Sequence, residues 1–427
     1  MLQKKWLYDT PYLFLALLII FFLLNHSPNS VDYDAPSYIN FDPIRPPLYP
    51  VFVWLCHWAG AYQFKLVVWI HAIFTFSAML YARYWLKTYL KIADFIIFLM
   101  CIFVTFTILF HYQLLLISSE GLTFPFFICT FFLLIECSKE FNLKKLSYLA
   151  LWTGLLVLTR LQFYYFYAIF ALLCMWYCWK RVPIKPLSIG IAILLGSILL
   201  TSFIDRSYHY FKHGYFSPAP ASGALLIVQP LFLLGDTQAD NYFKDAQYKI
   251  VVHKILTQIN KMKLNKEANL LSAKRALYYE NAYEEYNKNY IPIHDLVSQT
   301  LADGKPFEIN TMATNITKVL VFHDLQRNIF FFLWKFMAFV GDIPLFLFFL
   351  IVFLVLIIKV VNDRNWEPHF APIFVAMIAL ITFLNAATVA ALVPYQTTYF
   401  CYSQFMLYCL STFLADSVFL KMQGHAN

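Results

Sequence analysis

The stretch "PYLFLALLIIFFLLN", residues 11–25, decides the fold class of this chain. It contains no charged residue, and apolar runs of the same kind recur along the sequence. A bilayer core takes about 20 apolar residues per helix, and the backbone polar groups of a spanning segment must pair within the protein. The alternation typical of β-barrel strands is absent. We therefore expect an all-α polytopic membrane protein.

The overall composition agrees with this fold class. The chain has 427 residues, of which 61% are hydrophobic and only 13% are charged, far from the balance of soluble globular proteins. The formal net charge is +8, but the cations are scattered at loop ends instead of forming one stripe, so we expect no nucleic-acid partner. The eight cysteines lie in or beside apolar runs, which predicts free thiols and no disulfide framework.

The apolar runs predict about ten transmembrane spans. They cover residues 12–24, 62–81, 92–110, 119–135, 146–158, 163–179, 187–204, 344–361, 370–393 and 398–419. The first run resembles a signal sequence, but the following "NHSPNS" has no small-residue cleavage site, so we expect a retained helix. Lysine and arginine gather in alternate loops, which predicts that both termini are cytoplasmic.

These spans divide the chain into three expected parts. They are an N-terminal transmembrane module at 1–204 with a first outer loop at 25–50, an extracytoplasmic helical domain at 205–327, and C-terminal transmembrane helices at 328–427. The middle part is the one long polar stretch, and "NKEANLLSAKRALYYENAYEEYNK" favours helix. After it, "RNIFFFLWKFMAFVGD" places Arg327, Lys335 and Asp342 around aromatic residues, which predicts a helix lying along the outer interface.

The stretch "DYDAPSYINFDPIRPPLYP", residues 32–50, carries an unusual density of polar groups for such an apolar chain. Its prolines exclude a helix around Arg45 and predict an extended segment that presents this side chain. Asp34 and Tyr38 share one face if a helix begins at "DAPSYINF", with Asp34 as its N-cap. Capping alone is an alternative explanation for Asp34.

Further charged residues lie at the ends of the expected spans. Glu120 begins the fourth span and Arg160 ends the fifth. A charge at mid-bilayer costs about 2.5 to 3.5 kcal/mol, so both are expected at a boundary or in a wet cavity. The predicted topology places them on the outer side, with polar residues from other loops: Asp32, Asp34, Arg45, Asp205, Arg206, His209, His213, Tyr395, Gln396 and Tyr399.

For any single one of these residues, a helix end among lipid headgroups is the simpler explanation. Their combination with an acidic, proline-stiffened loop indicates an outward-facing site. Carboxylates and arginines together suit a transfer reaction on a phosphate-bearing lipid. A carboxylate takes the proton of the attacking hydroxyl, and a guanidinium neutralises the departing phosphate.

Four short motifs resemble the GT-C superfamily of polyprenyl-phosphate-dependent glycosyltransferases. They are "DYDAPSY" and "RPPLYP" in the first loop, "ISSEGLTFPFF" at the fourth span and "GLLVLTR" at the end of the fifth. Within the superfamily, the chain is most similar to the protein O-mannosyltransferases and the lipid A aminoarabinose transferases. The resemblance covers roughly the first 180 residues. Near the last span, "PYQTTYFCYSQF" has Thr398 where the family often has an arginine.

The resemblance implies a GT-C-like fold and transfer of a sugar, with inversion, from polyprenyl phosphate to a lipid, glycan or protein acceptor. It places the enzyme in the bacterial inner membrane with its site facing the periplasm or exterior. Asp34 is the implied base and Asp32 the second choice, and Glu120 orients the acceptor or binds Mg²⁺ or Mn²⁺ together with Asp34. The implied phosphate ligands are Arg45, Arg160 and Arg206, and the implied pocket residues are Tyr38, Tyr49, His57, Tyr395 and Gln396.

Three other functions are alternatives to this one. A transporter or flippase of lipid-linked sugars needs polar residues along a path through the bundle, whereas the middles of these spans are almost entirely apolar. A glycan polymerase or ligase is expected to have arginine-rich outer loops, whereas the long loop here is rich in lysine. A scaffold role leaves "RPPLYP" and the convergent acids unexplained.

Overall fold

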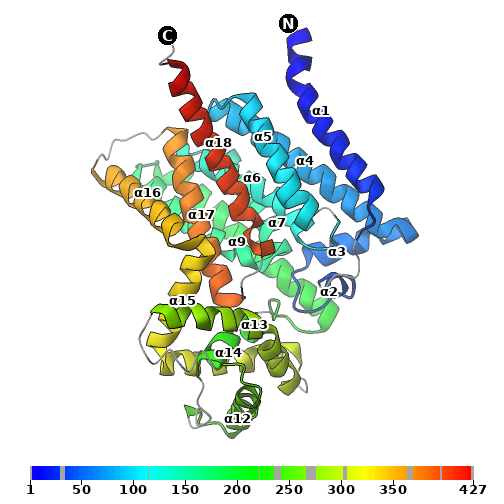
Figure 1. Cartoon of the computed structure of the whole chain (residues 1–427), viewed down its shortest axis with the longest axis vertical. Helices are drawn as coiled ribbons and strands as arrows, with labels where there is room; N and C mark the ends of the chain where they lie inside the picture. Colours follow the sequence, from blue (N-terminus) through cyan, green and yellow to red (C-terminus); the bar gives the residue numbers. More distant parts are fainter. Residues whose placement is uncertain are drawn as a thin grey trace. The chain divides into compact units, whose positions relative to one another are not determined.

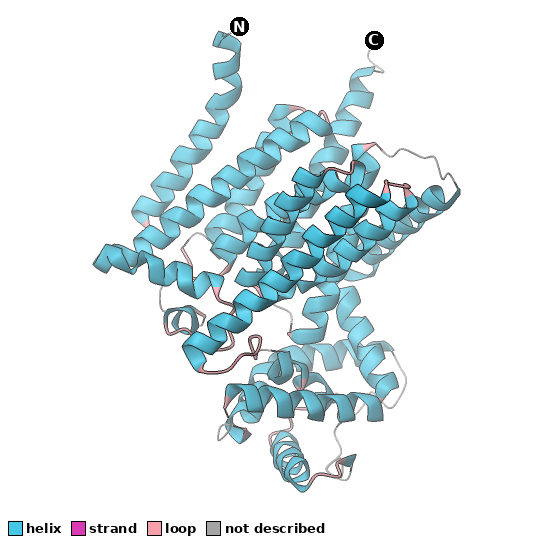
Figure 2. Cartoon of the chain, turned by 180° about the vertical axis from the view of Figure 1, so that it is seen from behind, coloured by secondary structure: helices cyan, strands magenta, loops and turns pink. Residues whose placement is uncertain are grey.

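The computed structural model describes residues 2–28, 34–113, 115–220, 222–234, 242–265, 276–301, 305–362, 369–394 and 397–424. Within these ranges the regular secondary structure is helical and no β-strand is present (Figure 2). The expected all-α class is therefore confirmed.

Several helices have the length and composition needed to cross a membrane. Among the described residues, five helical stretches qualify singly: Leu48–Tyr89, Glu120–Lys139, Leu161–Trp179, Ile184–His213 and Phe370–Leu392. A sixth candidate is the pair Leu325–Val340 and Ile343–Lys359, which is bent by 87°. Shorter apolar helices cover Asp9–Asn25, Asp94–Phe110 and Gly223–Leu234. These helices are compatible with a membrane-embedded protein.

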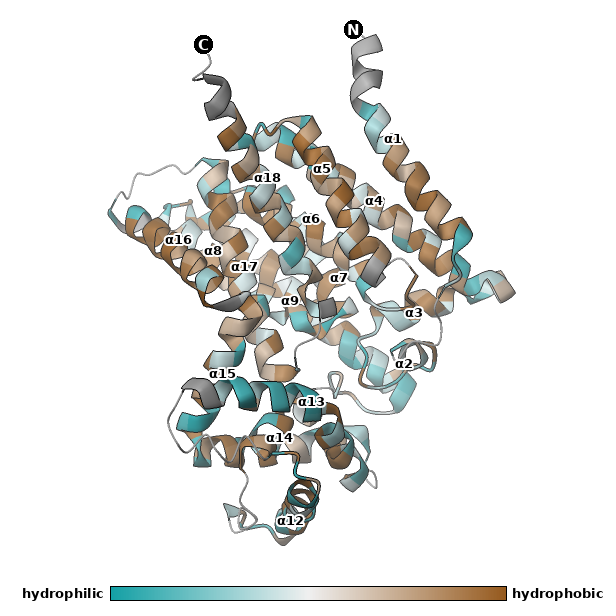
Figure 3. Cartoon of the chain, viewed as in Figure 1, coloured by the Kyte–Doolittle hydropathy of each residue, from teal (hydrophilic) through white to brown (hydrophobic). Residues whose placement is uncertain are grey.

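Contacts within the chain define two compact units. Unit 1 comprises residues 1–214, 351–381 and 397–427, and unit 2 comprises residues 215–350 and 382–396. Figure 3 shows hydrophobic residues along the helices of unit 1 and more hydrophilic residues along α13 of unit 2.

Unit 1 contains the apolar helices of the N-terminal half and the last helix of the chain. Its α-helices are α1 (Leu2–Asn25), α2 (Ala35–Ile39), α3 (Leu48–Leu55), α4 (Gln63–Tyr89), α5 (Asp94–Val104), α6 (Glu120–Lys139), α7 (Leu143–Thr159), α8 (Tyr165–Trp179), α9 (Ile184–His213) and α18 (Cys401–Gly424). Shorter 3₁₀ or π segments are Cys56–Tyr62, Thr105–Gln113, Leu161–Tyr164 and Thr397–Phe400. The start of α1 and the end of α18 lie at the same end of this unit, and α2 and α3 lie toward the other (Figure 1).

Helix α6 forms the centre of unit 1. It packs against α4 and α7, and most of its residues are buried. Phe124 and Phe127 of this helix are fully buried and contact Tyr402 of α18. Because this helix begins at Glu120, its packing holds a carboxylate at the end of the most buried helix of the unit.

Unit 2 has its own hydrophobic core. Its helices are α10 (Ser222–Leu226), α11 (Val228–Leu234), α12 (Ala246–Lys261), α13 (Ala276–Thr300), α14 (Pro306–His323), α15 (Leu325–Val340), and parts of α16 (Asp342–Asn362) and α17 (Phe370–Leu392). Fully buried core residues include Phe232, Tyr286, Ile316, Leu320 and Phe331. The polar part of the chain is helical, as expected.

The units do not divide where the sequence suggested. Helix α9 continues past residue 204 to His213, and the left-handed Gly214 (φ 82°) ends it, so Asp205–His213 belongs to unit 1. At the other end, α15 belongs to unit 2 although the expected domain ended at residue 327. Hydropathy changes at the membrane boundary, whereas a unit boundary depends on which helices pack together.

Lys335 does not face outward from the helix predicted to lie along the outer interface, because its side chain is fully buried in unit 2. The interfacial position of that helix stays a prediction. The Lys335 ammonium donates to Gln229 Oε1 at 3.1 Å and to the Tyr286 hydroxyl at 3.3 Å. An aromatic and basic helix face packs equally well on a protein core when polar acceptors meet its cation.

The approach of α10 to α14 depends on a glycine. A Cβ atom at position 223 would lie 2.3 Å from the backbone oxygen of Asn310. We expect Gly223→Ala to destabilise the protein by about 1–3 kcal/mol, because the backbone of α14 must shift. A lower thermal unfolding midpoint in detergent would show this.

The matched control is Gly196→Ala in α9, where an added Cβ has no atom within 4 Å. It is expected to be neutral or stabilising, because alanine favours helix over glycine by up to about 1 kcal/mol. Equal midpoints for the two variants would contradict the close helix contact.

Candidate functional site

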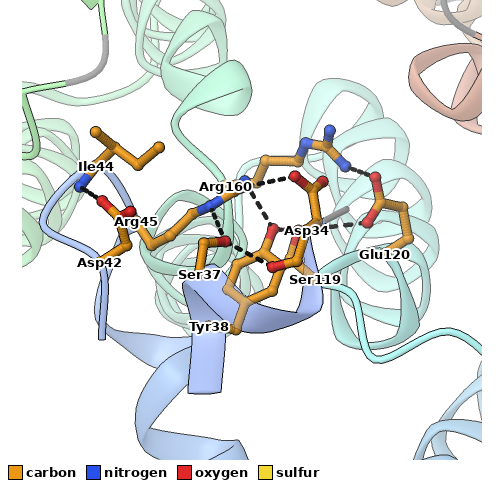
Figure 4. Close-up of polar contacts among 9 residues, drawn as sticks. All are labelled: Asp34, Ser37, Tyr38, Asp42, Ile44, Arg45, Ser119, Glu120 and Arg160. Atoms are coloured by element: carbon orange, nitrogen blue, oxygen red, sulfur yellow. Dashed lines mark hydrogen bonds and ion pairs between the residues drawn. The ribbon is translucent and has the colours of Figure 1, made fainter. Parts of the chain in front are cut away.

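Asp34 stands where the sequence placed it, but its carboxylate has a different partner. It occupies the N-cap position of α2, with proline in the first turn, yet makes no capping hydrogen bond. Instead, its Oδ1 forms an ion pair with the Arg45 guanidinium (Figure 4). Helix capping therefore does not account for this carboxylate.

Arg45 is held by several partners at once. Its Nε donates to Ser37 Oγ at 2.8 Å and its Nη1 donates to the Tyr38 hydroxyl at 3.1 Å, in addition to the ion pair with Asp34. The segment is non-helical, as its prolines predict, but it turns instead of extending: the Arg45 amide donates to the Asp42 carbonyl at 3.0 Å. This turn brings Arg45 back onto α2.

A second carboxylate–arginine pair is more deeply buried than the pair of Asp34 and Arg45. Glu120 at the start of α6 pairs with Arg160 at the end of α7, and their side chains are only 5% and 12% exposed. The Arg160 guanidinium also lies over the Tyr399 ring, 4.4 Å from its centroid. Both residues were expected at one face from sequence, and the structure brings them into direct contact.

Two hydroxyls join the two pairs into one network (Figure 4). The Tyr38 hydroxyl donates to Ser119 Oγ at 3.0 Å, and Ser119 Oγ lies 3.5 Å from Glu120 Oε2. Because Tyr38 also accepts from Arg45, polar contacts run without a break from Asp34 to Arg160. Three parts of the chain that are distant in sequence supply this network: residues 34–45 in α2 and the loop after it, residues 119–120 at the start of α6, and Arg160 at the end of α7.

Burial and charge act in opposite directions on the loop side of this network. Burial raises the pKa of Tyr38 above its usual value, so its hydroxyl remains neutral and can donate. Burial alone would lower the pKa of Arg45, but Tyr38 and the Asp34 carboxylate outweigh it, and the pKa is raised. The Asp34 side chain is 38% exposed, so the network opens to solvent at Asp34 and closes at Glu120.

The end of α9 anchors the loop. His209 Nε2 lies 2.9 Å from the Pro43 carbonyl, and its Nδ1 lies 2.8 Å from the Asp205 carbonyl. Lys212 lies over the Phe41 ring, 4.1 Å from its centroid. Helix α9 therefore fixes the position of the turn that carries Arg45.

Of the other residues expected at the site, some contact the network and others do not. Tyr49 is buried and its ring meets Tyr38 edge-on at 4.7 Å. Arg206 donates to Ser202 within its own helix at 3.2 Å, and the exposed His57 contacts Gln63 at 3.3 Å, so neither contact joins the network. Asp32, Tyr395 and Gln396 lie outside the described residues.

The structure gives the metal prediction no direct support. Among the described residues, no group of three or more histidine, cysteine or acidic side chains is arranged to hold a metal ion. The two carboxylates named for it, Asp34 and Glu120, are each paired with an arginine. Binding of Mg²⁺ or Mn²⁺ there stays a prediction. All eight cysteines are free, as expected.

His71 is not among the site residues predicted from the sequence. This histidine lies on α4 in the middle of an apolar run, is fully buried, and packs against α6 beside Glu120. A titratable side chain inside an apolar span is itself a signal of function, and this signal was available in the sequence.

No family model, no curated protein and no solved structure matches this chain.

Proposed function

We propose that this protein is a membrane glycosyltransferase of the GT-C type, which moves a sugar from a polyprenyl-phosphate carrier to a lipid, glycan or protein acceptor. The network from Asp34 to Arg160 carries this proposal. It gathers two carboxylates and two guanidinium groups from parts of the chain that are distant in sequence, and these groups suit a sugar transfer from a phosphate.

In the proposed reaction, the Asp34 carboxylate takes the proton of an acceptor hydroxyl. The acceptor oxygen attacks the anomeric carbon from the face opposite the phosphate, the bond from that carbon to the phosphate oxygen breaks, and the configuration inverts. The departing polyprenyl phosphate keeps the bonding electrons, and Arg45 and Arg160 neutralise its negative charge.

The Asp34–Arg45 pair has a consequence for this reaction. The Arg45 guanidinium contacts the carboxylate that is proposed as the base. A donor phosphate that binds Arg45 competes with Asp34 for this guanidinium and releases the carboxylate to contact the acceptor hydroxyl. Donor binding would then free the base, and Ser37 and Tyr38 would keep Arg45 in place.

The arrangement of unit 1 supports the proposed orientation. Helices α2 and α3 lie toward the end opposite the start of α1 and the end of α18 (Figure 1). With about ten spans and cytoplasmic termini, as the distribution of cations predicts, the network faces the periplasm or cell exterior of a bacterial inner membrane. Nucleotide sugars are absent from that compartment, so a lipid phosphate is the natural leaving group.

The test is a transfer assay with purified protein in nanodiscs. Labelled sugar is supplied on polyprenyl phosphate or as a nucleotide sugar, with a membrane lipid extract as acceptor, and product length is measured. We expect addition of one sugar from the lipid donor alone. Transfer from the nucleotide sugar would refute the donor class, a ladder of products would indicate a polymerase, and movement of the donor across liposomes without transfer would indicate a flippase.

A further inference from the structure

His71 is a buried polar side chain that the proposed reaction does not yet use. It is 0% exposed, and neither ring nitrogen has a hydrogen-bond partner among the described residues. Buried polar groups are nearly always paired, and an unpaired one lowers the stability of the fold. An imidazole kept in this position needs a reason beyond packing.

The position of the imidazole is tightly defined. A Cβ atom on Gly121 would lie 2.3 Å from His71 Nδ1 and 2.4 Å from its Cε1. The ring therefore occupies space that only glycine leaves open at the first turn of α6. Gly121 follows Glu120 directly, so the imidazole lies beside the buried carboxylate of the network.

A second unpaired group adjoins the first. The Tyr49 ring stacks on His71 with ring centroids 5.8 Å apart and planes at 28°. Its hydroxyl is buried and also has no partner among the described residues. The same ring contacts Tyr38 edge-on. Three unpaired polar atoms, two on His71 and one on Tyr49, therefore border the network where α3 and α4 meet it.

We propose that His71 and Tyr49 form the subsite that binds hydroxyl groups of the transferred sugar. A neutral imidazole offers one donor and one acceptor, and a phenol offers both, which matches hydroxyls that donate and accept. A phosphate accepts only, and it is better matched by Arg45 and Arg160. The class of ligand rests on the proposed function, whereas the observation that these three polar atoms are unpaired is independent of it.

Binding at this subsite requires local movement. The rings of Tyr49 and Phe52, both on α3, pack against the imidazole and cover it. Rotation of side chains on binding is common, and here it need involve only this short helix. These covering rings keep water from the imidazole nitrogens, which the sugar hydroxyls would pair after the rings move.

The first experiment measures stability and binding together in His71→Met. Thermal unfolding in detergent is expected at an unchanged or higher temperature, because an apolar side chain of similar volume removes two unpaired polar atoms. Affinity for mannosyl and aminoarabinosyl polyprenyl phosphate is expected to fall by about tenfold for each hydrogen bond lost, whereas affinity for polyprenyl phosphate alone stays the same. His26→Met, at an exposed histidine after α1, is the matched control for both measurements.

Conservative variants locate the contact. Asparagine places its amide near Nδ1 and glutamine near Nε2, so one of His71→Asn and His71→Gln is expected to restore part of the sugar affinity. Tyr49→Phe is expected to weaken sugar binding without lowering the unfolding temperature.

The outcomes separate this inference from the proposed function. A lower unfolding temperature in His71→Met, with equal weakening for polyprenyl phosphate alone, would show a structural histidine and overturn the subsite. Wild-type sugar affinity in His71→Met, with transfer intact, would also overturn it and leave the glycosyltransferase standing. A wild-type protein that binds neither conjugate would overturn both.

Discussion

Asp34→Asn is expected to bind the donor as the wild type does and to transfer almost nothing. The amide keeps the shape of the carboxylate and can still accept a hydrogen bond from Arg45, but it cannot take a proton. General base catalysis contributes about 10²–10⁴-fold to rate, so a loss of that size is expected in single-turnover transfer by membrane vesicles. Because the Asp34 side chain is 38% exposed, the substitution should change folding stability little.

Asp42→Asn is the matched control in the same loop. The Asp42 carboxylate accepts from the Ile44 amide at 3.0 Å within the turn. The asparagine amide oxygen can accept the same bond, so transfer should continue. Wild-type turnover in Asp34→Asn would remove the base assignment, and equal loss in both variants would indicate that the loop needs its charge and not one specific base.

Arg160→Gln is expected to cause the largest loss of stability. It leaves the Glu120 carboxylate, 5% exposed, without its cationic partner. Breaking a buried pair by removing one partner costs about 3–5 kcal/mol, because the remaining charge stays desolvated. The double variant Glu120→Gln with Arg160→Gln should recover most of this loss. The unfolding free energies of the wild type, the two single variants and the double variant, measured in detergent, give the coupling energy between Glu120 and Arg160 directly.

A second ion pair in unit 1 provides the control for Arg160→Gln. Lys145 pairs with Glu136 at 3.0 Å, but its side chain is 29% exposed, against 12% for Arg160. Lys145→Gln should therefore cost clearly less. Equal losses for the two single variants would mean that the Glu120–Arg160 pair is better hydrated than the structure shows.

The chemical role of Glu120 is tested separately from its role in stability. Transfer by Glu120→Gln is compared with that of the wild type during titration with Mg²⁺ or Mn²⁺. A loss of activity, or an altered metal response, would support its assignment as a second acid. Unchanged activity in both assays would indicate that Glu120 has no chemical role and serves only as the first residue of α6.

Much of the local structure followed from the sequence alone. The apolar runs located the helices, because only a helix pairs all backbone groups of a long apolar segment internally. Proline chemistry kept Arg45 out of a helix and placed Asp34 at the N-cap of α2. These features depend on neighbours within a few residues, so they can be read without knowledge of the fold.

What the residues contact required the tertiary structure. The sequence grouped Asp34, Arg45, Glu120 and Arg160 at one face, but which acid meets which arginine depends on how α2, α6 and α7 pack. Lys335 shows the same limit, since a helix face of aromatic and basic residues suits lipid headgroups and a protein core equally.

For His71, the sequence and the tertiary structure each determine a different feature. The sequence determined that an imidazole would lie inside an apolar helix of this protein. That helix packs against Gly121, where a Cβ would overlap the ring. Only this packing places the His71 imidazole beside Glu120 and leaves its two nitrogens unpaired. Helix formation is set by interactions between neighbouring residues, whereas the surroundings of a buried side chain are set by the shapes of helices that are distant in sequence.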